Sequence, residues 1–230
     1  MKKSYYTAVG HFRRKTDAIG RSYPVILVRG KEYTVDIQEM TLWTALSWRL
    51  LDISQVEAEY DRLTRDSAVP ERRTMKNCLG RLCTRGLAAS GTGDTDFEAL
   101  YDLLGRLYVA PVSDSLPTRL AAFFSLVVLR GIPFAKAKAL LIRDKRTGQE
   151  TQIMRLVHQA FMSVGELVKC VEIGAEDVST DEKLMRALYD DDYTTDLNIA
   201  DMMRTAKWRK GVTEAIANLY LRKQIIFERI

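Results

Sequence analysis

The stretch EMTLWTALSWRLLDISQVEAEYDRLTRDSAVPERRTMKNCLGRLCTRG, residues 39–86, decides the fold that the sequence predicts. Apolar side chains recur within it at helical spacing in three short runs. The expected helices cover about 39–50, 55–66 and 71–85. Ser54 and Glu57 match a capping box at the start of the second helix, and Gly86 can take the left-handed conformation that ends the third. Helix, turn, helix, basic helix and glycine is the order of a helix-turn-helix DNA reader.

The residues before this stretch predict a β-hairpin. Residues 24–28 and 32–35 are rich in β-branched side chains and flank a glycine turn. Residues 1–22 are basic and read as irregular, and the first 35 residues hold eight basic and two acidic side chains, a net charge of +6. A basic arm of this kind can reach phosphates or a minor groove, but an ordinary solvated terminus has the same composition.

A winged helix also needs strands after its third helix. Residues 87–90 suggest the first wing strand, with a turn at 91–93. The next residues read as a helix from about 97 to 108, so the second wing strand is either missing or supplied by 108–112.

Nearly everything beyond 112 reads as helical, and we find no internal repeat. The expected helices cover about 118–130, 134–143, 149–173 and 180–189, followed by a short helix and a long final one to Ile230. The fold class is therefore predicted as mainly α. A winged-helix-like domain with an N-terminal β-hairpin would cover residues 1–112, and an all-α helical bundle would cover residues 113–230. Apolar residues 225–227 would dock on the chain's own core or, as we slightly favour, on a second subunit.

Composition narrows the class of protein. The chain has 230 residues, of which 47% are hydrophobic and 28% charged, with a net charge of +5; these values are typical of a globular protein. The N-terminus lacks the apolar segment of a signal peptide, and the longest apolar run, 120–129, is too short to cross a bilayer. Three cysteines form no disulfide framework. We expect a soluble cytoplasmic protein with no membrane partner.

The third predicted helix carries most of the candidate functional residues, and the end of the second helix carries two. The apolar stripe of the third helix leaves a polar row on the opposite side, because consecutive residues are about 100° apart. The candidates for contacts to DNA bases are Arg73, Asn77, Arg81 and Thr84. The candidates for contacts to phosphates are Arg62, Arg65, Lys76 and Arg85. Arg pairs bidentately with guanine and Asn with adenine. The alternative is a solvated helix face without a partner.

Catalytic signals are weak. The two histidines, His11 and His158, are far apart in sequence, and the cysteines lack nearby metal-ligand partners. Residues 91–93 are not followed by the Gly-Lys-Ser/Thr of a phosphate loop, and the acidic run 190–192 lacks the spaced ligands of a calcium loop. We therefore expect no enzymatic activity, no cofactor and no metal.

Residues 74–87, TMKNCLGRLCTRGL, resemble the recognition helix of penicillinase-repressor-like regulators, and residues 42–46 resemble their first helix. This resemblance to winged helix-turn-helix bacterial regulators of transcription covers residues 42–87. It implies operator binding through this helix as a homodimer. The apolar spacing of the final predicted helix makes the C-terminal helices the expected contact between subunits. Two features depart from those repressors: the second wing strand is missing where expected, and the C-terminal half is longer.

The hairpin that precedes the three helices points to a second class. A three-stranded or hairpin element followed by a winged helix also resembles the leader-peptide recognition domains of peptide-modification pathways. That resemblance implies an extended peptide added to a sheet edge. The sequence therefore favours a DNA-binding regulator of transcription, with a non-catalytic protein- or peptide-interaction module on a winged-helix scaffold as the alternative.

Overall fold

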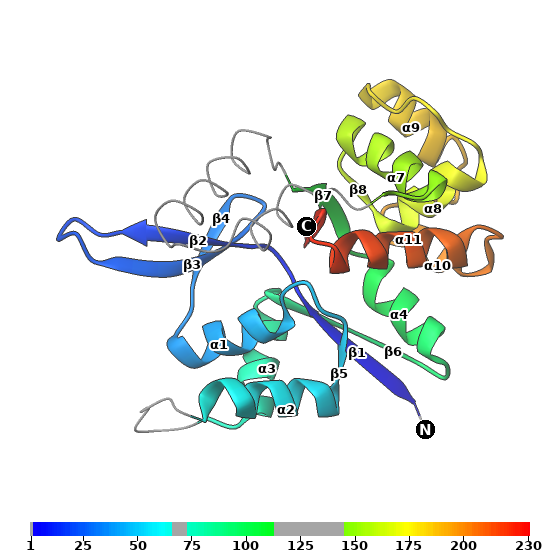
Figure 1. Cartoon of the computed structure of the whole chain (residues 1–230). Helices are drawn as coiled ribbons and strands as arrows, with labels where there is room; N and C mark the ends of the chain where they lie inside the picture. Colours follow the sequence, from blue (N-terminus) through cyan, green and yellow to red (C-terminus); the bar gives the residue numbers. More distant parts are fainter. Residues whose placement is uncertain (1, 66–72, 113–144) are drawn as a thin grey trace.

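The computed structural model describes residues 2–65, 73–112 and 145–230. About 48% of the described residues are helical and 22% lie in strands, which form three small sheets. The expectation of a mainly α protein, with a winged-helix-like domain followed by an all-α bundle, is wrong. Both halves of the chain contain a sheet, and the first half contains two (Figure 1). The helices predicted at 118–130 and 134–143 lie outside the described residues.

The elements up to residue 111 are β1 (Lys3–Ala8), β2 (His11–Thr16), β3 (Ser22–Val28), β4 (Lys31–Thr34), α1 (Ile37–Leu46), β5 (Leu51–Asp52), α2 (Ile53–Thr64), α3 (Met75–Thr84), β6 (Ala88–Gly93), α4 (Asp96–Leu104) and β7 (Tyr108–Pro111). From residue 145 they are α7 (Gly148–Gln159), β8 (Met162–Ser163), α8 (Val164–Glu172), α9 (Asp181–Tyr189), α10 (Ile199–Met202), the 3-10 helix η3 (Met203–Thr205), α11 (Arg209–Leu221) and β9 (Ile225–Glu228).

The three helices predicted within 39–86 are present, with shifted starts. The capping box of α2 is formed by Asp52 and Gln55, not by Ser54 and Glu57. Helix α3 begins at Met75, because the Thr74 side chain accepts a hydrogen bond from the backbone N–H of Asn77 and so caps the helix. It ends before Gly86, whose φ of 71° is the left-handed conformation expected there.

The N-terminal residues form the central strand of the first sheet, whose order is β5-β1-β6. Strand β1 runs antiparallel to all six residues of β6, and Tyr5 and Tyr6 face the short strand β5. The expectation that residues 1–22 are irregular is therefore wrong. The strand that seemed to be missing after β6 comes from the start of the chain, not from 108–112.

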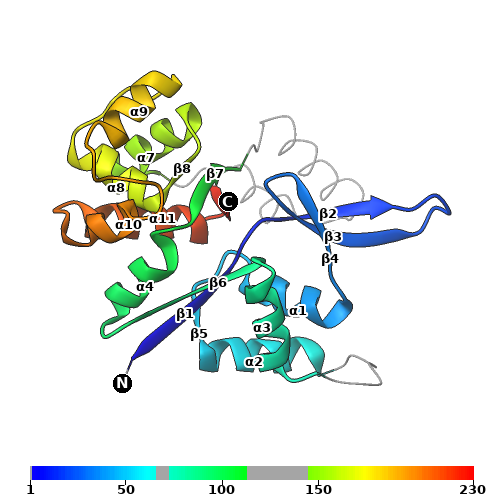
Figure 2. The ribbon, with the colours of Figure 1, turned by 180° about the vertical axis from the view of Figure 1, so that it is seen from behind.

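The predicted hairpin is confirmed as β3 and β4, and β2 adds a third strand in the order β2-β3-β4. The two-residue turn Arg29–Gly30 has positive φ at both positions, 47° and 75°, as a tight type I′ hairpin requires. Strands β2 and β3 form a two-stranded ribbon that projects from the rest of the molecule (Figures 1 and 2).

The C-terminal half contains the third sheet, β8-β7-β9. The single helix predicted over 149–173 is two helices, α7 and α8, interrupted by the two-residue strand β8. The predicted final helix ends at Leu221, and Ile225 and Phe227 are fully buried in β9, which pairs with β7. This apolar end docks on its own chain, so it no longer supports the expectation of a homodimer. Strand β7 belongs to this sheet although it precedes the predicted domain boundary at 112.

The two halves of the chain share one order of elements, which the sequence did not reveal. In each half a central strand (β1 or β7) is followed by a helix (α1 or α7), a two-residue strand (β5 or β8), a second helix (α2 or α8), a further helix (α3 or α11) and an edge strand (β6 or β9). The first and second helices of each half begin with matching capping boxes. The expectation of no internal repeat is therefore wrong at the level of structure.

Helix α4 lies against the first sheet and connects the halves, whose buried side chains form one hydrophobic core. The hydroxyl of Tyr220 in α11 accepts a hydrogen bond from the backbone N–H of Trp48 (2.9 Å) and lies 2.9 Å from the Thr7 hydroxyl. Gly91 of β6 faces the backbone of α4, where a Cβ would lie 2.0 Å from the Leu103 nitrogen. Strand and helix pack here at a distance that only glycine permits.

Gly91→Ala and Gly80→Ala form a matched pair that tests this packing. We expect Gly91→Ala to lower the free energy of unfolding by about 3 kcal/mol, since the clash is with backbone atoms and overpacking typically costs about 1–3 kcal/mol. Gly80 lies inside α3 with nothing within 4 Å of its Cβ position, so Ala should stabilise the protein by up to about 1 kcal/mol. Urea unfolding measures both changes, and equal effects would contradict the packing described.

Candidate functional site at the third helix

Helix α3 presents a polar face to solvent, opposite its buried residues. The exposed residues of this face are Lys76, Asn77, Gly80, Arg81 and Thr84. The buried ones are Met75, Cys78, Leu79 and Leu82. The row Asn77, Arg81 and Thr84 therefore points outward as the helical spacing predicts, whereas Arg73 precedes the helix and does not extend that row.

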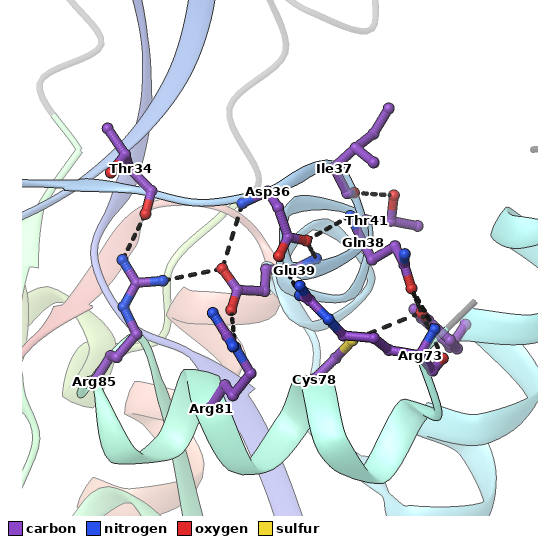
Figure 3. Close-up of polar contacts among 11 residues, drawn as sticks. Thr34, Asp36, Ile37, Gln38, Glu39, Thr41, Arg73, Cys78, Arg81 and Arg85 are labelled. Atoms are coloured by element: carbon purple, nitrogen blue, oxygen red, sulfur yellow. Dashed lines mark hydrogen bonds and ion pairs between the residues drawn. The ribbon is translucent and has the colours of Figure 1, made fainter. Parts of the chain in front are cut away.

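A buried carboxylate lies between α3 and α1. Glu39, only 1% exposed, is the third residue of α1 and completes its capping box with Asp36. Its two oxygens accept hydrogen bonds from Arg81 Nε (2.5 Å) and Arg85 Nη1 (2.9 Å), as Figure 3 shows. Two guanidinium groups of α3 thus neutralise one carboxylate that has left water, and they fix α3 against the start of α1.

The second half repeats this contact with one arginine instead of two. Glu150 occupies the same place in the capping box of α7 and is fully buried, and Arg222, directly after α11, lies 3.2 Å from it. Arg222 corresponds to Arg85, directly after α3. The residue four positions earlier is Asn218, an exposed side chain, where the first half has Arg81. One arginine is enough to hold the buried glutamate of the second half, so Arg81 is an addition specific to the first half.

Arg73 is also engaged with α1. Its guanidinium is hydrogen-bonded to the Asp36 carboxylate, and its backbone N–H donates to the Gln38 side chain at 2.8 Å. Partial burial acts to raise the pKa of Asp36, but hydrogen bonds from the Glu39 backbone N–H and from Arg73 outweigh it and hold that pKa below its usual range. Arg73 and Arg81 would have to leave these carboxylates in order to reach DNA bases.

Arg85 joins α3 to the edge strand β4. Its Nη2 donates to the Thr34 carbonyl at 2.5 Å, and its guanidinium lies 6.0 Å from the centre of the Tyr33 ring. Beside this contact a surface hollow of about 410 Å³ follows the outer face of α3. It is lined by Lys76, Asn77, Gly80, Arg81, Thr84 and Arg85.

Strand β4 has one free edge in the part of the chain that the structure describes, where it pairs with β3 alone. In an antiparallel pair, successive residues turn their backbone N–H and C=O groups alternately toward and away from the partner. Residues 28 and 31 flank the two-residue turn and face each other, so Glu32 and Thr34 turn their backbone groups away from β3. The contact of the Thr34 carbonyl with Arg85 agrees with this direction.

The remaining phosphate candidates differ in their surroundings. Arg62 donates two hydrogen bonds of 2.9 Å to Glu59, which Arg49 also contacts. The hydrogen bond from Arg62 is the largest cause of the low pKa of Glu59, about 2. Arg65 and Lys76 are exposed and form no ion pair with a described residue. Of the four residues predicted to contact phosphates, only Arg65 and Lys76 form no ion pair within the described part of the chain.

The described residues offer little reactive chemistry. Burial raises the pKa of the Cys78 thiol, and that of Cys170 to about 12, so both stay protonated at neutral pH. Within residues 2–65, 73–112 and 145–230, no three His, Cys, Asp or Glu side chains are grouped closely enough to hold a metal. In the same part of the chain, no helix combines the length and apolarity needed to span a bilayer.

No protein-family model, curated protein or solved structure matches the chain. The site is therefore defined by its own geometry. Sequence reasoning identified the exposed face of α3 and, through the second resemblance, the edge of the hairpin. It missed the carboxylates beneath α3 and the position of the β4 edge beside that helix. One signal was available, because Asp36 and Glu39 have capping-box spacing.

Two variants, compared with wild type, test the buried carboxylate. Removing both arginines with Arg81→Ala/Arg85→Ala leaves the Glu39 charge buried and unpaired, and should lower the free energy of unfolding by about 3–5 kcal/mol. Adding Glu39→Gln to that variant should restore much of the loss, because the buried group is then neutral. Urea unfolding of the three proteins measures the effect. A double-arginine variant as stable as wild type would show that the contact does not hold the fold.

Proposed function

We propose that the chain is a non-catalytic peptide-interaction module that adds an extended peptide to the outer edge of β4. The observation that carries this proposal is the position of that edge, which lies beside the hollow over α3 and is joined to it by Arg85. Main-chain hydrogen bonds to a sheet edge provide affinity for any extended peptide, and neighbouring pockets select its side chains.

The edge offers the hydrogen-bonding groups that such a peptide needs. Glu32 presents an outward N–H and C=O, and Thr34 presents an outward N–H while its carbonyl is held by Arg85. A peptide strand pairs with these groups without disturbing the β3–β4 ladder. Because β4 has four residues, the edge alone gives only a few hydrogen bonds, and the side-chain contacts over α3 must supply the selectivity.

The charge of the hollow favours an acidic peptide. Lys76 and Arg81 are exposed at its surface, and the acidic partner of Arg81, Glu39, is buried beneath it. Gly80 leaves open space at the centre of the face. A glycine inside a helix costs about 1 kcal/mol relative to alanine, and no described residue occupies the space that it leaves. Access for a ligand accounts for the glycine inside the helix and for the open space beside it.

A proline substitution in β4 tests the edge directly. Glu32→Pro removes an outward N–H that β3 does not use, so we expect the fold to remain and peptide binding to fall at least about tenfold, the effect of losing one hydrogen bond of about 1.4 kcal/mol. Glu32→Ala is the matched control, because it removes the same carboxylate and keeps the N–H. The probe is a set of acidic peptides selected on the wild-type protein from a random display library, with affinities from fluorescence anisotropy.

The outcome separates edge pairing from a purely electrostatic contact. Glu32→Ala should bind as wild type does or slightly better, since one acidic group is gone. Equal affinity of the proline and alanine variants would rule out strand addition at β4.

DNA binding is the second candidate, as a bacterial cytoplasmic regulator of transcription that reads an operator as a homodimer. The exposure of Lys76, Asn77 and Thr84 on one face of α3 favours it. Arg73 and Arg81 are less available, because each is paired with a carboxylate of the α1 start. Base contact would therefore fall mainly on Asn77 and Thr84, with Arg65 and Lys76 on phosphates.

Two single variants test this candidate against duplexes selected on the wild-type protein. Lys76→Ala should weaken binding to all duplexes and reduce the salt slope by about 1, as expected for one lost phosphate contact. Asn77→Ala should cost about 1–3 kcal/mol and relax the preference at one base pair. Anisotropy at two salt concentrations measures both effects. Wild-type behaviour of both variants would exclude α3 as the DNA-reading helix.

A further inference from the structure

The β2–β3 ribbon carries positive charge that no described residue neutralises. Arg13, Arg14 and Arg21 form no ion pair with any described residue, whereas Lys15 is paired with Glu32 of β4 at 2.5 Å. Every residue of β2 except Lys15 is exposed, and the ribbon extends away from the labelled helices (Figures 1 and 2). Three guanidinium groups therefore stand in solvent on a protruding arm.

The tip of the ribbon is fixed by one side chain. The Asp17 carboxylate accepts hydrogen bonds from the backbone N–H groups of Ile19 (2.9 Å) and Arg21 (2.8 Å), and the Asp17 N–H donates to the Arg21 carbonyl. Asp17 is the one acidic residue between positions 11 and 24, and its carboxylate is used within the turn. The turn presents Ile19 outward with 78% of its surface exposed.

We propose that this ribbon binds duplex DNA independently of the peptide site, with Arg13, Arg14 and Arg21 on phosphates and Ile19 entering the minor groove. Neighbouring residues of a strand point to opposite faces, so Arg13 and Arg14 extend from the two faces of the ribbon toward the two backbones that border a groove. Apolar side chains such as Ile act as wedges between base steps in minor-groove binders.

The arrangement fits a linear polyanion better than an anionic membrane. The arginines lie at three positions of the ribbon, and the turn at its tip has one large apolar side chain, Ile19, next to Ala18 and the polar Thr16 and Ser22. Phe12 and Tyr23 are also exposed, but they lie on the strands and not in the turn. One apolar side chain gives little burial in a bilayer, whereas phosphates spaced along a duplex match charges spaced along an arm. The proposal does not depend on the peptide function, because none of the three arginines lies at β4 or α3.

The test compares two triple variants of the full chain with the same change of charge. Arg13→Ala/Arg14→Ala/Arg21→Ala removes the ribbon charges. Arg155→Ala/Arg186→Ala/Lys207→Ala removes three exposed basic residues of the C-terminal half. The probe is an A·T-rich duplex of arbitrary sequence, with affinity measured by anisotropy at several salt concentrations.

We expect the ribbon variant to lose affinity on the order of tenfold or more at low salt and to reduce the salt slope by about 3, one for each phosphate contact. The control variant should change both quantities far less. Ile19→Ser should keep the salt slope but reduce bending of the duplex, measured by energy transfer between its labelled ends. Affinity of the ribbon variant for the selected acidic peptides should stay unchanged, which separates this proposal from the peptide function.

Three results would overturn the proposal. The first is equal loss of DNA affinity in the two triple variants, which would reflect net charge alone. The second is failure of the wild-type protein to bind the duplex at low salt. The third is binding to vesicles of anionic phospholipid that depends on the ribbon arginines while DNA binding does not. Because these residues are exposed, all variants should unfold at the wild-type urea concentration.

Discussion

A buried glutamate at the start of one helix, held by an arginine directly after another, organises each half of this protein. In the first half Arg85 and Arg81 hold Glu39, and in the second Arg222 holds Glu150. A carboxylate removed from water is tolerable only with a charged, hydrogen-bonding partner. Since the glutamate also completes the capping box of its helix, the contact fixes how the first and last helices of each half are placed.

Comparison of the two halves separates the elements they share from those inserted in one half only. We call the shared elements the frame: a central strand, three helices, a two-residue strand and an edge strand. Arg85 and Arg222 occupy equivalent positions, and so do β1 and β7 in the middle of their sheets. The halves differ in Arg81, which has Asn218 as its counterpart, and in the segments inserted into the frame. Between α8 and α11 the second half inserts α9, α10 and η3, and between β1 and α1 the first half inserts β2, β3 and β4.

Local patterns allowed part of this structure to be predicted from the sequence. Helical spacing identified α1, α2 and α3, and the turn chemistry at Gly30 identified the β3–β4 hairpin, because both signals are contained in a few neighbouring residues. The pairing of β1 with β6 joins segments at opposite ends of the first half, and β8 has only two residues, so no local pattern marks either. The outward face of α3 was predictable from its period, but the carboxylates of Asp36 and Glu39 come from another helix. Their pairing with Arg73 and Arg81 required the fold.

The inserted sheet of the first half carries both surfaces that we assign to partners. Its outer strand β4 has an edge beside α3 that pairs with no other strand in the described part of the chain, and its other two strands form the charged ribbon. A frame that occurs twice in one chain does not by itself account for the two proposed functions, which depend on β4 and on the ribbon. The contact between Arg85 and Thr34 connects the frame to the inserted sheet. Arg85 stabilises the frame through Glu39 and also holds the edge of the inserted sheet against α3. The proposed binding at β4 is therefore expected to depend on the buried Glu39 beneath it, even though that carboxylate is only 1% exposed.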